Sequence, residues 1–349
     1  MTSPNASDPR LMALHLWLDQ QDSALGLQAD SLVPVSGDAS FRRYFRLQAA
    51  KGPLIVMDAP PPHEDCTSFV EAAARLAAGG LRVPDILAQD QTHGFLLLTD
   101  MGRQTFFQAI QAGATQDDAT WQQHMRGALR ALVRLQHCDT DGLPTYDASR
   151  LLQELSLFPQ WYLQAHLGVT PDADTQAMLT RTFALLVGQT ATQPQVFVHR
   201  DYHSPNLMIG MGAPDFVPGI IDFQDAVLGP ISYDLASLVM DARTTWDESQ
   251  QLDWAIRYWE HARTAGLPVP ADFTEFHTQY EWMGLQRNLR ILGIFARLAL
   301  RDAKPQYLDH IPRVRAYVNQ VASRYQVFHP LLRMLEHAEN APTRDGYSF

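Results

Sequence analysis

Residues 196–209 combine two short apolar runs with a polar loop between them, and this arrangement constrains the fold more than any other part of the chain. The loop carries Asp201 and Asn206. Short apolar runs bounded by polar turn residues are typical of buried β-strands. A third apolar run, Gly219–Ile221, ends at Asp222. We therefore expect both acids to follow buried strands and to hold their carboxylates outside the core.

The polar loop has the order H-R-D-x-x-x-x-N. In protein kinases this spacing provides the catalytic base and a metal-binding asparagine, and a metal-binding aspartate follows the next strand. Carboxylate and amide oxygens suit Mg²⁺, which takes one or two protein carboxylates and keeps several waters. We interpret Asp201 as the base of a phosphoryl transfer, and Asn206 and Asp222 as ligands of Mg²⁺. The alternative is that both acids merely cap the ends of strands.

Other side chains near the loop are expected to support it. His199 is expected to bond to backbone near the metal ligands, and Arg200 to be exposed or paired. A purely structural role is the alternative for His199, since buried polar groups are usually hydrogen-bonded. His203 lies inside the loop and is a candidate contact of the acceptor. We expect Asp234 to brace the loop from the start of a helix.

The pattern of the chain changes near residue 100. Before it, short apolar or alternating runs predict strands, with an opening helix at Pro9–Gln20 and one helix at Phe69–Ala77. After it, long helical patterns dominate. The predicted strands are Leu32–Val35, Phe41–Leu47, Pro53–Met57 and Phe95–Leu98, and the predicted later helices are Trp121–Gln136, Arg150–His166, Asp174–Gln189, Asp253–Ala265, Phe273–Arg301 and Val314–Tyr325.

These elements predict an α+β, bilobal, protein-kinase-like fold. The N-lobe, residues 1–100, is expected to be a small mixed sheet with one helix that binds the nucleotide. The C-lobe, residues 101–349, is expected to be mainly helical and to carry the catalytic loop, the metal site and the acceptor site. A hinge is expected at Thr99–Gly102.

Composition restricts the partners of such a chain. The net charge is −11, whereas binding nucleic acid needs a surplus of Lys and Arg. No apolar stretch is long enough to span a bilayer, and the first residues lack the pattern of an export signal. Cys66 and Cys138 show no pairing pattern, which suits a reducing compartment. We therefore expect a cytoplasmic protein with no nucleic-acid or membrane partner and no evident obligate protein partner.

Two segments, His199–Met208 and Ile220–Leu238, resemble the aminoglycoside phosphotransferase and choline kinase family. Members of this family have a kinase-like fold and phosphorylate hydroxyl groups of small molecules, and the resemblance covers nearly the whole chain. Three further segments, Gly37–Arg46, Ile55–Pro61 and Leu292–Leu298, are similar to one branch of it. That branch comprises the cell-wall-recycling sugar kinases, which phosphorylate the anomeric hydroxyl of N-acetylmuramate and N-acetylglucosamine. This amino-sugar substrate is implied by the resemblance alone and not by the types and spacing of the residues.

The resemblance also implies ATP and Mg²⁺ as cofactors and indicates where the nucleotide binds. A loop of small residues would lie over the triphosphate, where backbone N–H groups can approach phosphate oxygens. This loop is Ser36, Gly37, Asp38, Ala39 and Ser40. Backbone groups of Leu97–Asp100, which include Leu98 and Asp100, would meet the adenine edge. Glu71 is the candidate acid of the N-lobe helix.

The chain departs from the kinase pattern at one position. Kinases carry a lysine on the third strand that holds the α- and β-phosphates. The matching strand, Leu54–Asp58, contains no lysine. Alternation along the preceding strand places Arg42 and Arg46 on one face and Arg43 on the other. We predict that Arg43 or Arg46 replaces the lysine, because a planar guanidinium suits phosphate; a solvated basic edge is the alternative.

The acceptor is expected between the catalytic loop and the helix Phe273–Arg301. Gln286, Arg290 and Arg297 share one face of this helix. An arginine there could meet the lactyl carboxylate of muramate, while Gln286 and Gln224 could bind hydroxyl or acetamido groups. Asp225 is a further candidate contact of the acceptor. The alternative for the helix is an ordinary amphipathic surface with Arg on its wet side.

Two other functions stay open at this point. The acceptor could be an aminoglycoside, a choline-like alcohol or another small hydroxyl compound, and the acidic net charge fits a polycation slightly better than a sugar acid. Alternatively, the missing lysine could indicate a nucleotide sensor without catalytic activity. The presence of Asp201, Asn206 and Asp222 together argues against such a sensor.

Overall fold

The computed structural model describes residues 8–35, 41–61, 63–115, 117–209 and 216–340. The N-terminal part is a five-stranded sheet in the order β1-β2-β3-β5-β4. Every neighbouring pair of strands in it is antiparallel, so the expected mixed sheet is wrong. The strands are β1 Gln28–Val35, β2 Arg43–Gln48, β3 Leu54–Asp58, β4 Ile86–Asp90 and β5 Phe95–Thr99.

Strand β4 was not predicted from the sequence. It lies at the edge of the sheet and pairs only with β5. Its residues alternate between half-buried and exposed, and none is buried. The alternation was present in the sequence, but its apolar contrast is weak because the apolar Leu87 is exposed and the charged Asp90 is half-buried.

The two faces of the sheet pack against different partners. On one face, Phe45, Val56 and Leu97 join a small core with α1, Pro9–Asp19. On the other face, Met57 joins the main core, which continues into the helical part of the chain. Because successive side chains of a strand point to opposite faces, β3 and β5 contribute to both cores.

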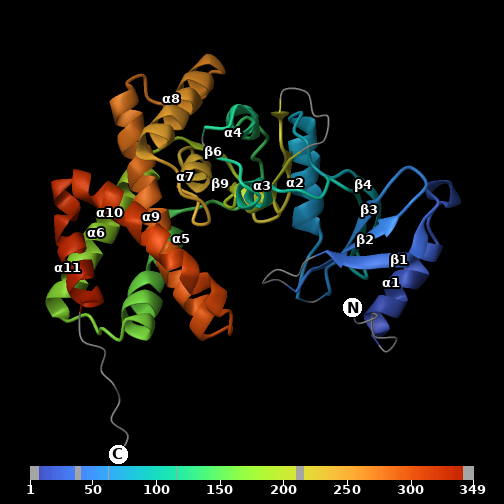
Figure 1. The fold of residues 1–349 in the computed structure, drawn as a ribbon, viewed down its shortest axis with the longest axis horizontal. Coiled ribbons are helices and arrows are strands. Elements are labelled where there is room, and N and C mark those ends of the chain that lie inside the picture. The colour runs from blue at the N-terminus through green and yellow to red at the C-terminus, as the bar shows by residue number, and fades with distance from the viewer. Residues whose placement is uncertain (1–7, 36–40, 62, 116, 210–215, 341–349) are drawn as a thin grey trace, which may run out of the picture.

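Helix α2, Thr67–Ala78, connects the sheet to the helical part. It ends at Gly79, as expected, and Gly80 follows with φ of 72°. The ring of Phe69 on this helix lies 4.8 Å from the ring of Phe223, directly after the expected metal ligand Asp222. Figure 1 shows α2 and α3 between the sheet with α1, at one end of the molecule, and α9, α10 and α11 at the other.

The helical part confirms most of the predicted helices. Two short antiparallel strand pairs interrupt it, β6 with β9 and β7 with β8. The strands are β6 Gln195–Val198, β7 Leu207–Met208, β8 Gly219–Ile220 and β9 Val227–Pro230. The helices are α3 Phe106–Gln111, α4 Ala119–Leu135, α5 Ala148–Leu155, α6 Ala173–Ala191, α7 Tyr233–Val239, α8 Glu248–Thr264, α9 Phe273–Leu300, α10 Ile311–Arg324 and α11 His329–Glu339.

Aspartates define the start of many of these helices. An aspartate before the first turn accepts hydrogen bonds from backbone N–H groups that have no partner inside the helix, which stabilises the helix by about 1 kcal/mol. This capping is seen before α1, α4, α5, α6 and α9. The residues are Asp8, Asp118, Asp147, Asp172 and Asp272.

The single helix expected at Arg150–His166 is two elements. Helix α5 ends at Leu155, and a π-helix, Phe158–His166, follows. Pro159 lies in the first turn of this π-helix, where its missing N–H does no harm, but it could not continue α5. Helix α11 was not predicted, although Leu331, Leu335 and Ala338 recur at helical spacing and are buried.

Helix α9 is the central helix of the C-terminal part. Its predicted apolar stripe of Leu285, Leu289, Leu292 and Ala296 is fully buried. At Gly293 the helix approaches the backbone of Leu157 so closely that an added Cβ would lie 2.4 Å from the Leu157 carbonyl carbon.

Two expectations concern the whole chain: the absence of a membrane-spanning segment and the division into two lobes. Within the described residues, no helix has both the length and the apolar character that crossing a bilayer requires. The division into lobes at residue 100 stays a prediction.

Candidate active site

The two short strand pairs bring the three predicted catalytic residues together. Asn206 follows a short 3₁₀ turn, and its Nδ2 donates to the backbone oxygen of Asp201 at 3.0 Å and to Oδ2 of Asp222 at 3.2 Å. The backbone N–H of Ile221 donates to the oxygen of Asn206 at 3.1 Å. The loop after β6 and the end of β8 therefore meet side by side, as the strand-end argument requires.

The donor set at this place fits a magnesium ion. Asp222 and Asn206 are hard oxygen ligands in contact with each other, and Mg²⁺ takes few protein ligands and keeps its waters. Gln224 Nε2 donates to Oδ1 of Asp222 at 2.8 Å and so orients the carboxylate. Among the described residues there is no cluster of three or more His, Cys, Asp or Glu that could hold a metal, and the assignment of Asn206 and Asp222 as ligands stays a prediction.

Two residues of the site have an unusual backbone. Arg200 has φ of 75° and Asp222 has φ of 65°. Residues other than glycine adopt positive φ at a cost of roughly 1–2 kcal/mol, and such residues cluster at functional sites. Here the conformation turns the chain sharply just before Asp201 and at the expected metal ligand.

Helix α7 holds the catalytic loop at both of its ends. At its start, the buried Asp234 accepts hydrogen bonds from the backbone N–H of His199 at 2.7 Å and of Arg200 at 3.0 Å, which confirms its expected bracing role. Beyond its end, the buried Asp241 accepts from the N–H of Ser204 at 2.9 Å and from its hydroxyl. The loop between residues 199 and 204 is thus fixed to one helix by two carboxylates.

His199 has the backbone contact that was expected. Its Nε2 lies 3.1 Å from the carbonyl oxygen of Ile221, next to Asp222. Its Nδ1 accepts from the N–H of Asp201 at 3.3 Å. The imidazole therefore bridges the two strand ends that carry the base and the metal ligand.

The surroundings of Asp201 favour its charged form. Burial raises the pKa of Asp201, but nearby positive charge outweighs burial and lowers the pKa to about 2; the groups responsible include His203, Arg290 and Arg287. Burial also lowers the pKa of His203 to about 3, so this imidazole is neutral near neutral pH. The two arginines of α9 then supply the charge that keeps Asp201 ionised.

Arg290 belongs to a network around Glu154. Its Nε lies 2.8 Å from Oε2 of Glu154, and its Nη1 donates to the hydroxyl of Tyr233 at 3.2 Å. Arg200 donates to the other oxygen of Glu154 at 2.7 Å, and Tyr146 also donates to this carboxylate. Arg200 is thus paired, one of the two outcomes expected. Arg290, predicted to contact substrate, uses its guanidinium inside the protein.

Several nucleotide contacts predicted from the resemblance stay predictions. Ser36, Gly37, Asp38, Ala39 and Ser40 lie outside the described residues. Leu98 is buried in the main core, so only its backbone is available to a ligand. Arg46 binds Asp100 through Nε at 2.6 Å and the carbonyl oxygen of Gly102 through Nη2 at 2.9 Å. This pair ties β2 to the segment directly after β5, where the hinge was expected.

Arg43 lies on the other face of the sheet. Its guanidinium binds Asp58 at 2.6 Å and Asp8 at 2.5 Å, beside the N-terminus of α1. Asp58 is fully buried and is also bound by Arg10 of α1. Arg43 therefore joins α1 to the sheet, and the replacement of the lysine by Arg43 or Arg46 stays a prediction.

The predicted acceptor residues are dispersed around the loop. His203 is buried, with Nε2 at 3.2 Å from Nδ2 of Asn206. Gln286 is fully buried, and neither polar atom of its side chain has a hydrogen-bond partner among the described residues. Asp225 is exposed, and Arg297 is half-buried. These four assignments, and that of Gln224, stay predictions.

Three residues with a place in the site were missed. Asp241 and Glu154 are acids in helical patterns that had no local motif, although a lone acid directly after the apolar run of α7 was a usable signal. Arg287 is only 3% exposed, and its charge acts on Asp201. It follows Gln286 directly, but its helical face could be distinguished from that of Arg290 only once α9 was placed.

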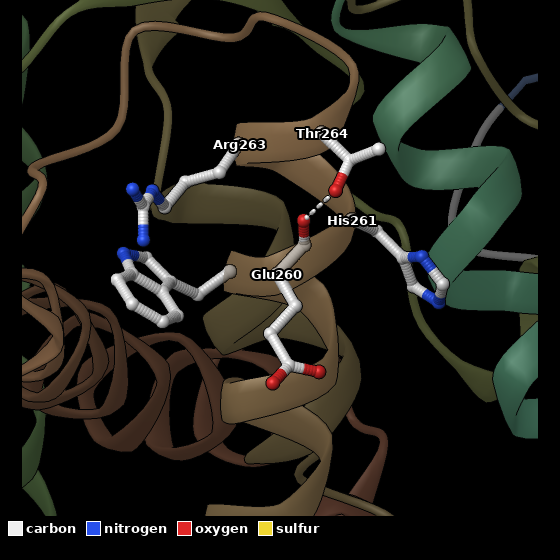
Figure 2. A pocket seen from close by; sticks show the side chains of 5 residues that line it. Glu260, His261, Arg263 and Thr264 are labelled. Atoms are coloured by element: carbon white, nitrogen blue, oxygen red, sulfur yellow. Dashed lines mark hydrogen bonds between the residues drawn. The ribbon is translucent and has the colours of Figure 1, made fainter.

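A cavity of about 660 Å³ lies away from these residues, on α8. Figure 2 shows Glu260 and His261 pointing to different sides of this helix. The Thr264 hydroxyl donates to the backbone oxygen of Glu260, and Arg263 lies over the ring of Trp259. Its polar groups do not converge on one point, and it contains none of the catalytic residues.

The fold and the loop geometry define a phosphotransferase of the kinase-like class. Residues 31–267 match the model of the phosphotransferase enzyme family. The match covers more than half of the chain, so the chain belongs to this family. The resemblance inferred from the motifs is therefore confirmed.

Two named kinases are similar to this chain over most of its length. The N-acetylmuramate/N-acetylglucosamine kinase of Pseudomonas aeruginosa is 44% identical over 327 residues, which is 91% of this chain and 94% of that protein. The kinase of the same name from Neisseria meningitidis serogroup B is 40% identical, over 90% of this chain and 92% of that protein.

Solved structures show the same fold at much lower identity. Plasmodium vivax ethanolamine kinase is 11% identical with a TM-score of 0.64, over 90% of each chain. An ADP-bound aminoglycoside phosphotransferase is 11% identical with a TM-score of 0.57, over 90% of this chain and 99% of that one.

Proposed function

We propose that this protein is an ATP- and Mg²⁺-dependent kinase that phosphorylates the anomeric C1 hydroxyl of N-acetylmuramate, N-acetylglucosamine or both, in the cytoplasm, as part of peptidoglycan recycling. The observation that carries the catalytic part is the contact of Asn206 with both Asp201 and Asp222. The substrate is supported by the shared name of relatives that are 40% and 44% identical over nearly the whole chain.

The residues have separate roles in this proposal. Asp201 orients the acceptor hydroxyl and accepts its proton. An anomeric hydroxyl is more acidic than an ordinary alcohol, so a carboxylate is an adequate base. Because the transition state of phosphoryl transfer is loose, Asp201 acts chiefly through orientation and charge. Asn206 and Asp222 would hold Mg²⁺, which neutralises charge on the phosphates.

The nucleotide is proposed to bind between the sheet and the catalytic loop. The loop at residues 36–40 would cover the triphosphate, and backbone groups at Leu98 and Asp100 would meet the adenine. The pairing of Arg46 with Asp100 supports this position because it orders the segment directly after β5.

Product analysis tests the proposal. Purified protein is incubated with ATP, Mg²⁺ and each of the two sugars, and the product is examined by ³¹P NMR. A sugar 1-phosphate shows coupling of phosphorus to H1, and the α anomer is expected. A phosphomonoester at another hydroxyl, or no product, would contradict the assignment of C1.

The second candidate is a phosphotransferase for aminoglycosides or choline-like alcohols. The net charge of −11 favours it, since a cationic acceptor would be attracted. The same assay with kanamycin, choline and ethanolamine as acceptors distinguishes the two. Turnover of these compounds without turnover of the sugars would make the second candidate the correct one.

A further inference from the structure

Arg287 is a buried cation that has no ion-pair partner in the part of the chain that the structure describes. Its side chain is 3% exposed, and among the described residues its Nε and Nη1 make no hydrogen bond and it forms no ion pair. Arg315, 8% exposed, is different because it binds Glu339 at 2.5 Å. An unpaired buried charge is strongly unfavourable, so a missing anionic partner is the simplest physical account of Arg287.

The position of Arg287 indicates that the missing partner would lie close to the catalytic loop. Just after Arg287, helix α9 contacts α7 and its C-cap: Asn288 Nδ2 lies 3.8 Å from the sulfur of Met240, and Arg290 Nη1 lies 3.2 Å from the hydroxyl of Tyr233. Helix α7 in turn holds the catalytic loop through Asp234 and Asp241. Arg287 therefore lies where α9 passes the loop, and its charge lowers the pKa of Asp201.

The neighbouring charges leave Arg287 available to a ligand. Arg290 is paired with Glu154 at 2.8 Å. Asp201 forms no ion pair with Arg287, although both belong to the described residues and the charge of one acts on the other. Of the two arginines that α9 places near Asp201, Arg290 has an ion pair and Arg287 has none among the described residues.

We propose that Arg287 binds the carboxylate of the acceptor, which is the lactyl group of N-acetylmuramate, while the acceptor hydroxyl lies at Asp201. This inference rests on the proposed function. The planar guanidinium can form two parallel hydrogen bonds to a carboxylate, and these are stronger in a buried site than in water. N-acetylglucosamine has no carboxylate, so it would be phosphorylated without this contact.

Selectivity between the two sugars tests the role of Arg287. In Arg287→Gln, kcat/KM for N-acetylmuramate is expected to fall about 10- to 100-fold, mainly through KM, because hydrogen bonds between charged groups are lost. For N-acetylglucosamine the fall is expected to be clearly smaller, because only the charge of Arg287 near Asp201 is lost, so the ratio of the two sugars changes. Arg315→Gln is the matched control: it removes the other buried arginine, and it is expected to lower the melting temperature without changing the ratio of the two sugars.

A change in the substrate tests the same contact without relying on the fold of a variant. The methyl ester of N-acetylmuramate lacks the negative charge, and the wild-type protein is expected to use it about as poorly as Arg287→Gln uses the acid. The variant should not distinguish the ester from the acid. Non-additivity of this kind is the mark of a direct contact.

The results of these experiments show whether the proposed function fails or only the proposed role of Arg287 fails. If the wild-type protein phosphorylates neither sugar, the proposed function fails and the inference fails with it. If the wild-type protein phosphorylates both sugars and Arg287→Gln loses both equally, only the inference is overturned, since Arg287 then acts through Asp201 or on the transferred phosphoryl group. An unchanged ratio, or a variant that still prefers the acid to the ester, overturns it as well.

Discussion

Asp201 is nearly enclosed by the protein and yet surrounded by positive charge, and the charge decides its state. Its pKa of about 2 means that it is ionised near neutral pH. In Asp201→Asn the position is filled but the proton acceptor is lost. We expect kcat to fall about 10²- to 10⁴-fold, with nucleotide affinity by calorimetry unchanged. Substantial remaining turnover would show that Asp201 is not the base.

The pH dependence of activity is expected to arise from Asp234 and not from Asp201. Burial raises the pKa of Asp234 to about 6, against the opposing effect of His199 and two backbone N–H groups. Below this pH the folded protein protonates Asp234 and weakens its hold on the catalytic loop. We expect kcat/KM to decrease as the pH falls below about 6. The Asp234→Asn variant is expected to be slower and to lack this acid limb of the pH profile. An acid limb that persists in the variant would exclude Asp234.

The effect of Asp234 on stability has the opposite sign to its effect on activity. An exposed aspartate in the unfolded chain has a pKa of about 3.9, so the folded state binds this proton more tightly. The contribution of Asp234 to the free energy of unfolding is therefore largest below about pH 4. It is lost as the pH rises through the folded value of about 6.

At the scale of the element, the close approach of α9 to the π-helix Phe158–His166 has a measurable consequence. A Cβ at Gly293 would lie 2.4 Å and 2.7 Å from backbone atoms of Leu157 and Phe158, which cannot move independently of their helix. We expect Gly293→Ala to lower the free energy of unfolding by about 1–3 kcal/mol through overpacking. The measurement is chemical denaturation.

Gly188 is the matched control for this prediction. It lies inside α6, and an added Cβ there would meet nothing within 4 Å. Alanine is the better helix former, so Gly188→Ala is expected to raise the free energy of unfolding by about 0.5–1 kcal/mol. If both substitutions changed stability in the same direction, the proposed packing of α9 would be wrong.

At the scale of the molecule, the two faces of the sheet separate two arginines that are close in sequence. Arg46 is tied to Asp100 and Gly102, directly after β5, whereas Arg43 is tied to Asp58 and Asp8 beside α1. We expect Arg46→Ala to raise the KM for ATP about three- to tenfold, because the segment after β5 loses its charged hydrogen bonds. Steady-state kinetics at saturating acceptor measures this.

Arg43→Ala is the companion variant and should behave differently. It leaves the fully buried Asp58 with Arg10 as its remaining cation. We expect a loss of about 1–3 kcal/mol in the free energy of unfolding, with the KM for ATP unchanged. Raised KM values in Arg43→Ala alone would assign the phosphate contact to Arg43 and not to Arg46.

The local parts of the protein were readable from the sequence. The spacing of Asp201, Asn206 and Asp222 is set by a loop and two short strands, so their contact follows from elements that are close along the chain. Helix α9 was predicted to begin at Phe273, where the structure places its start after the capping residue Asp272. Strand β4 and helix α11 were missed, because a weakly apolar edge strand and a short terminal helix take their stability from tertiary partners.

The sequence by itself determined the kinase-like order of elements, the catalytic loop and the two expected metal ligands, since each depends on residues within a few turns or strands of one another. Only the tertiary structure decided which face of the sheet meets α1, and therefore the different surroundings of Arg43 and Arg46. It also decided that Glu154 pairs with Arg290 while Arg287 has no partner among the described residues. The physical reason is that alternation and helical period define faces, but only long-range packing assigns each face a neighbour.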